Sequence, residues 1–373
     1  MTKTALITFT PLEPYFFGGE TTHGNGRERN YFSKSSPYPQ QTTLLGTLRN
    51  LLRLSGYNYG KQSFSPQQAN DYEKLVSLSP LFLQNPQGHF LLRQAIDRQP
   101  GKSALKLESM ENNAWALHDN GDLEFSKQWE NAGRWPDFKP KNKLVDEWIS
   151  TEGQIVKPEE IFKIFNRPGI PKQELLNPKL QADGTPEPDA VGLFKQDLML
   201  LEKGWTFCVL AEFTDDVDFN KLDGQNLQLG GEKSIFHTAV KEFAQAFEAL
   251  FPAAIFYPKN PPEQPRLVLA SDAWIPDTAW QYTIGAVTKT TDFRHISSPF
   301  GLANYGPLRE QIRHKNLKSD TSVKLSKSIK YTLLARGSVL LCADKIALGK
   351  LDSALRIEPW HSVGFNHFIT YCP

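Results

Sequence analysis

The chain has 373 residues, with 42 basic and 41 acidic side chains and a formal net charge of +1. This length suits two domains, or one large domain with insertions. The near-neutral charge argues against a free-standing, uniformly basic nucleic-acid-binding protein, so any RNA site must be a local basic patch. The cysteines are widely spaced and form neither a disulfide framework nor a zinc site. Without a signal pattern or a membrane-length apolar run, we expect a cytoplasmic protein with no membrane partner.

The N-terminal region predicts a strand, a long glycine-rich loop and an amphipathic helix. Apolar residues alternate along residues 4–10, as in a half-buried strand. Two prolines just before Gln40 disfavour helix, so we expect the helix to begin within residues 40–43. Leucines at helical spacing indicate one buried face. Gly46 lies among them, which suggests that the helix backbone lies close against a sheet.

The start of this helix is a candidate anion-binding site. The first N–H groups of a helix lack helical partners and can bind a phosphate. Glycines in the preceding loop would let an RNA backbone approach. The candidate contact residues of this region are Gly18, Gly19, Gln40, Gln41, Thr42 and Thr43. The glycines match neither a P-loop nor a dinucleotide fingerprint, because no Gly-Lys-Ser/Thr follows them and a proline-containing segment separates them from the helix.

Regular periodicity weakens in residues 56–166, which we interpret as an insertion after the first helix and not as a separate domain. Short helices are plausible within residues 67–78 and 143–149. An Asp-Asn-Gly sequence predicts the turn of a hairpin within residues 105–125.

Regular elements return in the second half of the chain. Two apolar runs, residues 191–201 and 205–213, flank a glycine-containing turn and predict an antiparallel hairpin. Helical spacing follows over residues 239–251, although its first residues could extend a strand. The proline-rich residues 252–265 indicate a linker or a rigid bend. Further strands are predicted at residues 266–270, 281–288, 331–341 and 367–371.

Single helices between strands in both halves predict an α+β fold of two ferredoxin-like (RRM-like) βαββαβ units. The first unit would span residues 1–250 and include the insertion at about 56–166. The second would span residues 251–373. Glycine turns from both units would then border one central cleft.

Three later motifs place glycine beside charged, polar or aromatic residues. A Gly-Gly-Glu-Lys sequence is either a tight turn with solvated charges or a backbone approach with a lysine on a phosphate. Arg-Gly-Ser inside a strand marks a bulge with an exposed arginine, or a site of close approach. A glycine and a phenylalanine near the C-terminus belong either to the core or to the cleft. The candidate RNA contacts of these motifs are Gly230, Gly231, Lys233, Arg336, Gly337, Ser338, Gly364 and Phe365.

Catalytic candidates are few. His23 lies in the first glycine-rich loop and could act as general acid or base on a ribose 2′-hydroxyl. Spacing identifies no partner for it, and a loop histidine is more often only solvated. No serine elbow, Walker sequence or paired His-Asp metal spacing is found. We therefore predict no catalytic residue, no metal site and no cofactor.

Together these motifs resemble the RAMP superfamily of CRISPR proteins and, more narrowly, the family of the third subunit of type III-B Cmr effector complexes. The matching segments are residues 9–18, 36–49, 167–170, 192–194, 229–233, 335–339 and 364–365. Their order across nearly the whole chain makes the resemblance specific. Residues 56–166 and 294–330 show no match.

The resemblance implies a non-catalytic subunit that holds the 5′ repeat-derived handle of CRISPR RNA in antiviral defence. Its expected partners are the handle, target RNA by way of the guide, the large polymerase/cyclase-like subunit and the backbone RAMP subunit. A hairpin inserted after the first helix would act as a thumb between guide and target. Two alternatives remain open: a metal-independent endoribonuclease that uses His23 to process CRISPR RNA, and an architectural subunit that contacts only protein.

Overall fold

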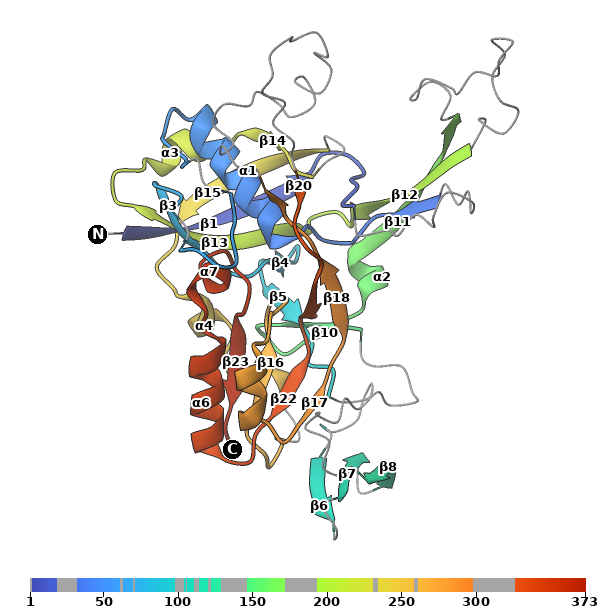
Figure 1. Ribbon diagram of the computed structural model, residues 1–373. Helices are drawn as coiled ribbons and strands as arrows, with labels where there is room; N and C mark the ends of the chain where they lie inside the picture. The colour runs from blue at the N-terminus through green and yellow to red at the C-terminus, as the bar shows by residue number, and fades with distance from the viewer. Residues whose placement is uncertain are drawn as a thin grey trace, which may run out of the picture.

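The described part of the chain is an α+β structure with mostly antiparallel sheets and few helices (Figure 1). The computed structural model describes residues 2–18, 32–60, 63–69, 71–97, 104, 106–110, 114–119, 122–128, 146–171, 193–230, 234–257, 261–297 and 326–373. The predictions for Gly19, His23, Gly231 and Lys233 lie outside these residues.

The largest sheet has β1 (Thr2–Pro11) near its centre. This strand pairs antiparallel with β13 (Thr206–Thr214) on one side and β15 (Ile235–Glu242) on the other. The sheet order is β10-β9-β5-β4-β13-β1-β15-β14, and β3 also pairs with β13. The other strands are β3 (Leu75–Leu78), β4 (Phe82–Gln84), β5 (Phe90–Arg93), β9 (Trp148–Ser150), β10 (Ile155–Val156) and β14 (Asn226–Gln228). The strand predicted from apolar alternation at residues 4–10 is confirmed.

Helix α1 (Gln41–Leu54) lies across this sheet and begins where the two prolines predict (Figure 1). Five of its leucines are buried with Ile7 and Phe9 of β1 in one core: Leu44, Leu45, Leu48, Leu51 and Leu52. The expectation for Gly46 is wrong, because this residue is exposed and nothing in the described chain lies within 4 Å of a Cβ placed there. Gly46 follows the buried Leu44 by two residues, which is a rotation of about 200° around the helix.

Residues 56–166 contribute five strands, from β3 to β10, to the large sheet. The short helices suggested for this region are wrong, because β3 and β9 lie there instead. The predicted hairpin is confirmed. It is part of a separate three-stranded sheet of β6 (Lys106–Met110), β7 (Ala114–Asp119) and β8 (Asp122–Gln128). Asp119 pairs with Asp122 across its turn.

The hairpin predicted from residues 191–213 is wrong, although both of its strands exist. Strand β12 (Leu193–Leu201) pairs with β11 (Phe162–Pro171) and, in parallel, with β2 (Phe32–Lys34). Strand β13 instead pairs with β1 on one side and with β3 and β4 on the other. Both edges of β13 are thus occupied, so the turn at Gly204 leads the chain from one sheet to the next. The β11–β12 ribbon projects beyond the large sheet (Figure 1).

The helix predicted over residues 239–251 forms only in part, and the alternative that its first residues extend a strand is confirmed, because β15 (Ile235–Glu242) runs into this range. Along β15, buried and exposed residues alternate, so the two-residue period outweighs the helical spacing. Only α4 (Phe247–Leu250) is helical. The other short helices are α2 (Pro158–Ile161), α3 (Phe219–Leu222), α7 (Glu358–His361) and the 3₁₀ turns η4 (Ala253–Phe256) and η5 (Asp277–Tyr282). No helix within the described residues has the length and apolar character needed to span a bilayer.

The C-terminal part forms a four-stranded antiparallel sheet in the order β17-β22-β16-β23. Its strands are β16 (Arg266–Leu269), β17 (Gly285–Val287), β22 (Val339–Leu341) and β23 (Phe368–Tyr371). Helix α6 (Lys345–Leu355) buries its leucines against one face of this sheet. The ribbon of β18 (Thr290–Phe293) and β21 (Tyr331–Leu334) and the short pair β19 (Ile296–Ser297) and β20 (Ser326–Lys327) extend from it (Figure 1).

Strand order is the same in two places. In the large sheet, the neighbours β15-β1-β13-β4 are the fourth, first, third and second of these four strands in chain order, and α1 follows β1. In the C-terminal sheet, β23-β16-β22-β17 repeats this order, and α6 precedes β23. The single strand predicted at residues 331–341 is divided into β21 and β22 by a turn at Gly337, whose φ of +84° an extended strand does not allow.

A buried ion pair joins the two parts of the molecule. Arg266 Nη1 lies 2.6 Å from Asp97 Oδ2, and Tyr257 Oη donates to the same oxygen at 3.0 Å. All three side chains are almost completely buried. Removing one partner would leave an uncompensated buried charge, so this contact holds β16 against the end of the β5 segment.

Candidate functional site

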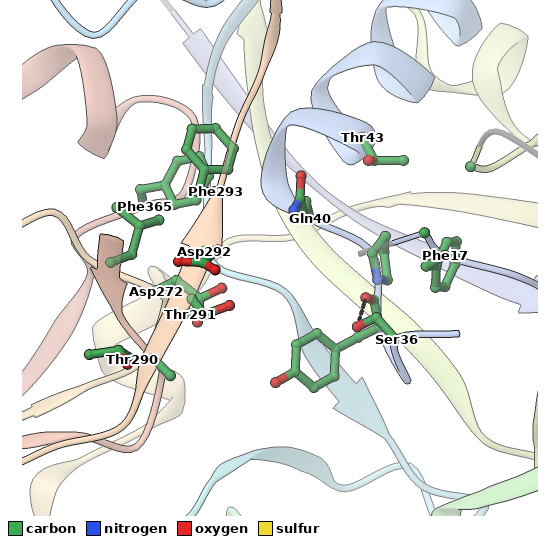
Figure 2. A pocket seen from close by; sticks show the side chains of 16 residues that line it. Phe17, Ser36, Gln40, Thr43, Asp272, Thr290, Thr291, Asp292, Phe293 and Phe365 are labelled. Carbon is green, nitrogen blue, oxygen red and sulfur yellow. Dashed lines mark hydrogen bonds between the residues drawn. The ribbon is translucent and has the colours of Figure 1, made fainter. Parts of the chain in front are cut away.

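A cavity of about 560 Å³ lies between the start of α1 and the β18–β21 ribbon. In Figure 2, Gln40 and Thr43 lie on one side of it and Thr290, Thr291 and Asp292 on the other. We call it the first cavity. The residues predicted from sequence that line it are Gly18, Gln40, Thr43, Gly230 and Phe365. The structure therefore brings glycine turns and a helix start from distant parts of the chain to one place.

Close backbone packing builds the N-terminal wall of the first cavity. The Phe17 N–H donates to Ser35 Oγ at 2.9 Å, and the Ser36 N–H donates to the Phe17 carbonyl at 2.8 Å. Gly230 lies against this pairing at a φ of +87°, where a Cβ would come within 3.0 Å of the Phe17 ring. A side chain there would adopt a strained backbone conformation and crowd the Phe17 ring.

Adjacent glutamines at the start of α1 have different surroundings. Gln40 is half-buried and its amide lies at the cavity (Figure 2). Gln41 is 1% exposed, and its amide donates to the Ser79 carbonyl at 2.9 Å and to the Val363 carbonyl at 3.3 Å. Its Oε1 accepts the Leu81 N–H at 3.2 Å. The Gln41 side chain thus anchors α1 to the core and does not point into the cavity.

The C-terminal glycine turn shares this anchoring role. Gly364 has a φ of +88°, and a Cβ on it would collide with the Gln41 amide. It therefore packs against the core side of α1 and does not line the cavity. Phe365 is 1% exposed and belongs to the core, while its edge forms part of the cavity wall. Thr42 is half-buried and lies outside the cavity lining.

The described lining of the first cavity does not have the chemistry of a phosphate cradle. Its polar groups are the hydroxyls and amide described above and the carboxylates of Asp272 and Asp292. Asp292 pairs with Lys330 Nζ at 2.7 Å. Among the described residues that line this cavity, none is a lysine or an arginine. Neutral donors, carboxylates and phenylalanine rings suit the edges and faces of a nucleobase better than a phosphate.

A second cavity, also of about 560 Å³, adjoins the first. The two share Tyr38, Thr290, Thr291 and Ala335, so they lie side by side, and we call the two cavities together the groove. Its charged lining residues are Arg93, Lys289, Arg336, Asp146 and Glu159.

Arg336, predicted to contact phosphate or a base, lies in the turn between β21 and β22 and is 3% exposed. Its backbone N–H donates to Asp272 Oδ1 at 3.0 Å, and its Nε lies 3.4 Å from the same oxygen. The guanidinium carbon is 4.3 Å from the Tyr38 ring centroid. Burial disfavours the charge, but Asp272 and Tyr38 together raise the pKa of Arg336 above its ordinary value. Nη1 and Nη2 have no hydrogen-bond partner among the described residues.

The neighbours of Arg336 shape the cavity wall. The Gly337 carbonyl accepts a hydrogen bond from the Ile96 N–H at 2.9 Å, and a Cβ on Gly337 would come within 2.7 Å of the Gln94 carbonyl. Ser338 is fully buried, and its Oγ accepts the Lys289 N–H at 3.1 Å. These two residues position Arg336 and Lys289, so the prediction that they contact RNA themselves is not supported by their burial.

Sequence reasoning did not find Tyr38, Arg93, Asp272 or Lys289. Tyr38 carries a weak signal, because it lies between two prolines in the loop that precedes α1. Arg93 ends β5, Lys289 precedes β18 and Asp272 follows β16 by three residues, and no local pattern sets these charged residues apart.

Comparison with known proteins agrees with the motif analysis. A family model described as "CRISPR-associated protein (Cas_Cmr3)" matches residues 7–371. The chain belongs to this family. The match confirms the resemblance to a type III-B, Cmr3-like RAMP protein. No curated protein matches the sequence.

Two solved structures are similar to the chain over nearly its whole length. One, described as "Cryo-EM structure of the Type III-B Cmr-beta bound to cognate target RNA", has a TM-score of 0.47 and 13% identity. The other, described as the same complex with target RNA and AMPPnP in state 1, has a TM-score of 0.46 and 14% identity. Each match covers 98% of this chain and 96% of the other.

Proposed function

We propose that the chain is a non-catalytic RNA-binding subunit of a type III-B CRISPR effector complex, and that its groove holds the 5′ repeat-derived handle of CRISPR RNA. The observation that carries the proposal is the groove itself. Residues of the N-terminal loop, the start of α1, the turn at Gly230 and the β18–β21 ribbon all line it. Membership of the Cas_Cmr3 family supports the assignment to a CRISPR effector.

The two cavities divide the work of binding a single strand. Single-stranded RNA is recognised through unstacked bases and through its phosphates. The first cavity offers neutral donors, carboxylates and aromatic edges for a base, and the second offers cations for a phosphate. Each volume of about 560 Å³ lies within the range of sites for small ligands.

The fold forms part of the proposal. We assign the two repeated strand orders to ferredoxin-like units within residues 1–250 and 251–373. The order β15-β1-β13-β4 and its counterpart β23-β16-β22-β17 support this assignment, since both place the fourth strand beside the first and the third beside the second. The groove would then lie between the two units.

The projecting β11–β12 ribbon is the candidate for the thumb. Ile164 and Phe165 of β11 are 65% and 49% exposed, although both are apolar. Exposed apolar side chains on a projecting ribbon suit insertion between stacked bases or against another subunit. The proposed protein partners are the large polymerase/cyclase-like subunit and the backbone RAMP subunit, with target RNA reached by way of the guide.

Direct binding tests the proposal. Purified full-length protein is titrated against fluorescein-labelled handle RNA, and fluorescence anisotropy gives the affinity. The double variant Gln40→Ala/Thr43→Val removes two hydrogen-bonding groups at the first cavity and should weaken binding about thirtyfold, because each bond contributes about 1 kcal/mol. Asn50→Ala, on α1 away from the cavity, is the control and should bind as the wild type does. Equal affinities for all three proteins would contradict the proposal.

The non-catalytic role has a separate test. Incubation of the purified protein with repeat RNA in EDTA should leave the RNA intact. Site-specific cleavage that disappears in His23→Ala would show instead a metal-independent endoribonuclease with this histidine as acid or base.

A further inference from the structure

We propose that the second cavity is a phosphate-binding site, in which the Asp146 carboxylate occupies the anion position until a phosphate group displaces it. This inference deepens the proposed function and rests on it only for the source of the phosphate. The observations that carry it are three converging cations, a buried guanidinium with two unused donors, and one exposed carboxylate that pairs with the other two cations.

The cations come from separate parts of the chain. Arg93 ends β5, Lys289 precedes β18, and Arg336 lies between β21 and β22. Their side chains are 13%, 39% and 2% exposed, in that order. Burial and the nearby Arg336 lower the pKa of Arg93, and burial and Arg93 lower that of Lys289. These like charges therefore repel one another, and an anion between them would relieve the repulsion.

Arg336 is arranged to receive two oxygen atoms. Asp272 holds its backbone N–H and Nε, and the Tyr38 ring lies against its guanidinium plane. Nη1 and Nη2 remain without partners among the described residues. A guanidinium with its fork free matches the geometry of two phosphate oxygens. Buried donors without partners are costly, so a ligand that accepts both bonds gains more than it would at an exposed arginine.

Asp146 marks where such an anion lies. Its Oδ1 pairs with Arg93 Nη2 and with Lys289 Nζ, the latter at 3.3 Å. One oxygen between two cations is the position that a phosphate oxygen would take. The Asp146 side chain is 59% exposed, and ion pairs at such sites contribute no more than about 1 kcal/mol. It can therefore be displaced at small cost.

A phosphate satisfies this cavity better than the carboxylate does. Asp146 serves two of the cations and leaves both terminal nitrogens of Arg336 without partners among the described residues. A phosphate group has more oxygens, so it can bond the Arg336 fork and replace Asp146 between the other two cations. The chemical class is thus a phosphate, carried either by bound RNA or by a free nucleotide.

Calorimetric titration of the full-length protein with inorganic phosphate tests the site. Asp146→Asn should bind phosphate about three- to tenfold more tightly, because the competing carboxylate is gone. Glu159→Gln removes the same charge from the same cavity without removing that competitor, and should change affinity less than about twofold. Arg336→Gln should weaken binding at least about tenfold. Asp352→Asn and Arg356→Gln, which break a surface ion pair on α6, are controls and should have no effect.

Two results would overturn the inference. One is the absence of phosphate binding by the wild type and by Asp146→Asn. The other is an equal gain in Asp146→Asn and Glu159→Gln, which would reflect only the general field of the cavity and not displacement.

Competition identifies the source of the phosphate. If handle RNA displaces inorganic phosphate, the group belongs to the RNA. If AMP, but not adenosine, binds to protein already saturated with handle RNA and is lost in Arg336→Gln, the group belongs to a free nucleotide. If the protein binds handle RNA with an affinity that neither Asp146→Asn nor added phosphate changes, this inference is contradicted while the proposed function stands. Phosphate binding without handle binding would contradict the proposed function and support the cavity as a phosphate site.

Discussion

The two cavities share a wall and differ in how their chemistry is supplied. The first is built by turns and a helix start, and its groups are neutral donors, carboxylates and aromatic edges. The second is lined by three cations from distant strands, two of which pair with a single carboxylate. Two neighbouring cavities can thus bind different parts of one RNA strand, with bases in the first and a phosphate in the second.

A change at Gly364 should damage the first cavity most. Gly364→Ala forces a side chain into a φ of +88° and against the Gln41 amide that anchors α1. We expect the free energy of unfolding to fall by about 2–4 kcal/mol, from backbone strain and lost hydrogen bonds. Urea unfolding followed by circular dichroism measures it.

Gly46→Ala is the matched control for that change. Gly46 lies in α1, the helix that Gly364 packs against, but nothing in the described chain lies within 4 Å of a Cβ placed on Gly46. Alanine should therefore raise the stability by about 0.5–1 kcal/mol through helix propensity. Destabilisation by Gly46→Ala, or none by Gly364→Ala, would contradict the packing described for α1.

Salt dependence should separate the cavities next. Lys289→Gln removes a cation and should weaken handle binding about fivefold and reduce the slope of log affinity against log salt by about 0.7. Gln40→Ala should weaken binding with no change in slope, because it removes a neutral contact. Anisotropy titrations at several salt concentrations measure both. A changed slope for Gln40→Ala would place phosphate at the first cavity and contradict the assignment of bases to the first cavity and phosphate to the second.

A smaller effect is expected from pH. Burial and Arg93 lower the pKa of Lys289, so this ammonium loses its proton at a lower pH than an ordinary lysine does. Inorganic phosphate should therefore bind about twofold more weakly at pH 9.5 than at pH 7.5. Lys289→Arg stays charged, so its affinity for phosphate should not change between these pH values. An equal fall in affinity in the wild type and in Lys289→Arg would assign the pH dependence to another group.

The sequence predicts the first cavity better than the second because its signals are local. Prolines before Gln40, glycines in turns and the amphipathic stripe of α1 depend on neighbouring residues. The prolines predict a helix start within residues 40–43, and α1 begins at Gln41. Lys289 and Arg93 have no such pattern. They come together only through the register of β5, β18 and the β21–β22 turn, which a single sequence does not reveal.

The failures have a common physical cause. The expectation for Gly46 rests on its place among the leucines, and that for Gln41 on its place at the helix start, yet the rotation around α1 exposes the first residue and buries the second. The strand pair of residues 191–213 was assigned from adjacency, but β13 finds its partners in β1, β3 and β4. Local propensity predicts that an element exists, and tertiary pairing decides what it contacts.

Crosslinking tests the central claim most directly. Handle RNA with a photoreactive base at each position in turn is bound to the full-length protein, irradiated, and the crosslinked peptides are identified by mass spectrometry. The account predicts crosslinks to residues 36–43 and 289–293, on opposite walls of the groove, from neighbouring handle positions. Crosslinks confined to surfaces outside both cavities would contradict it.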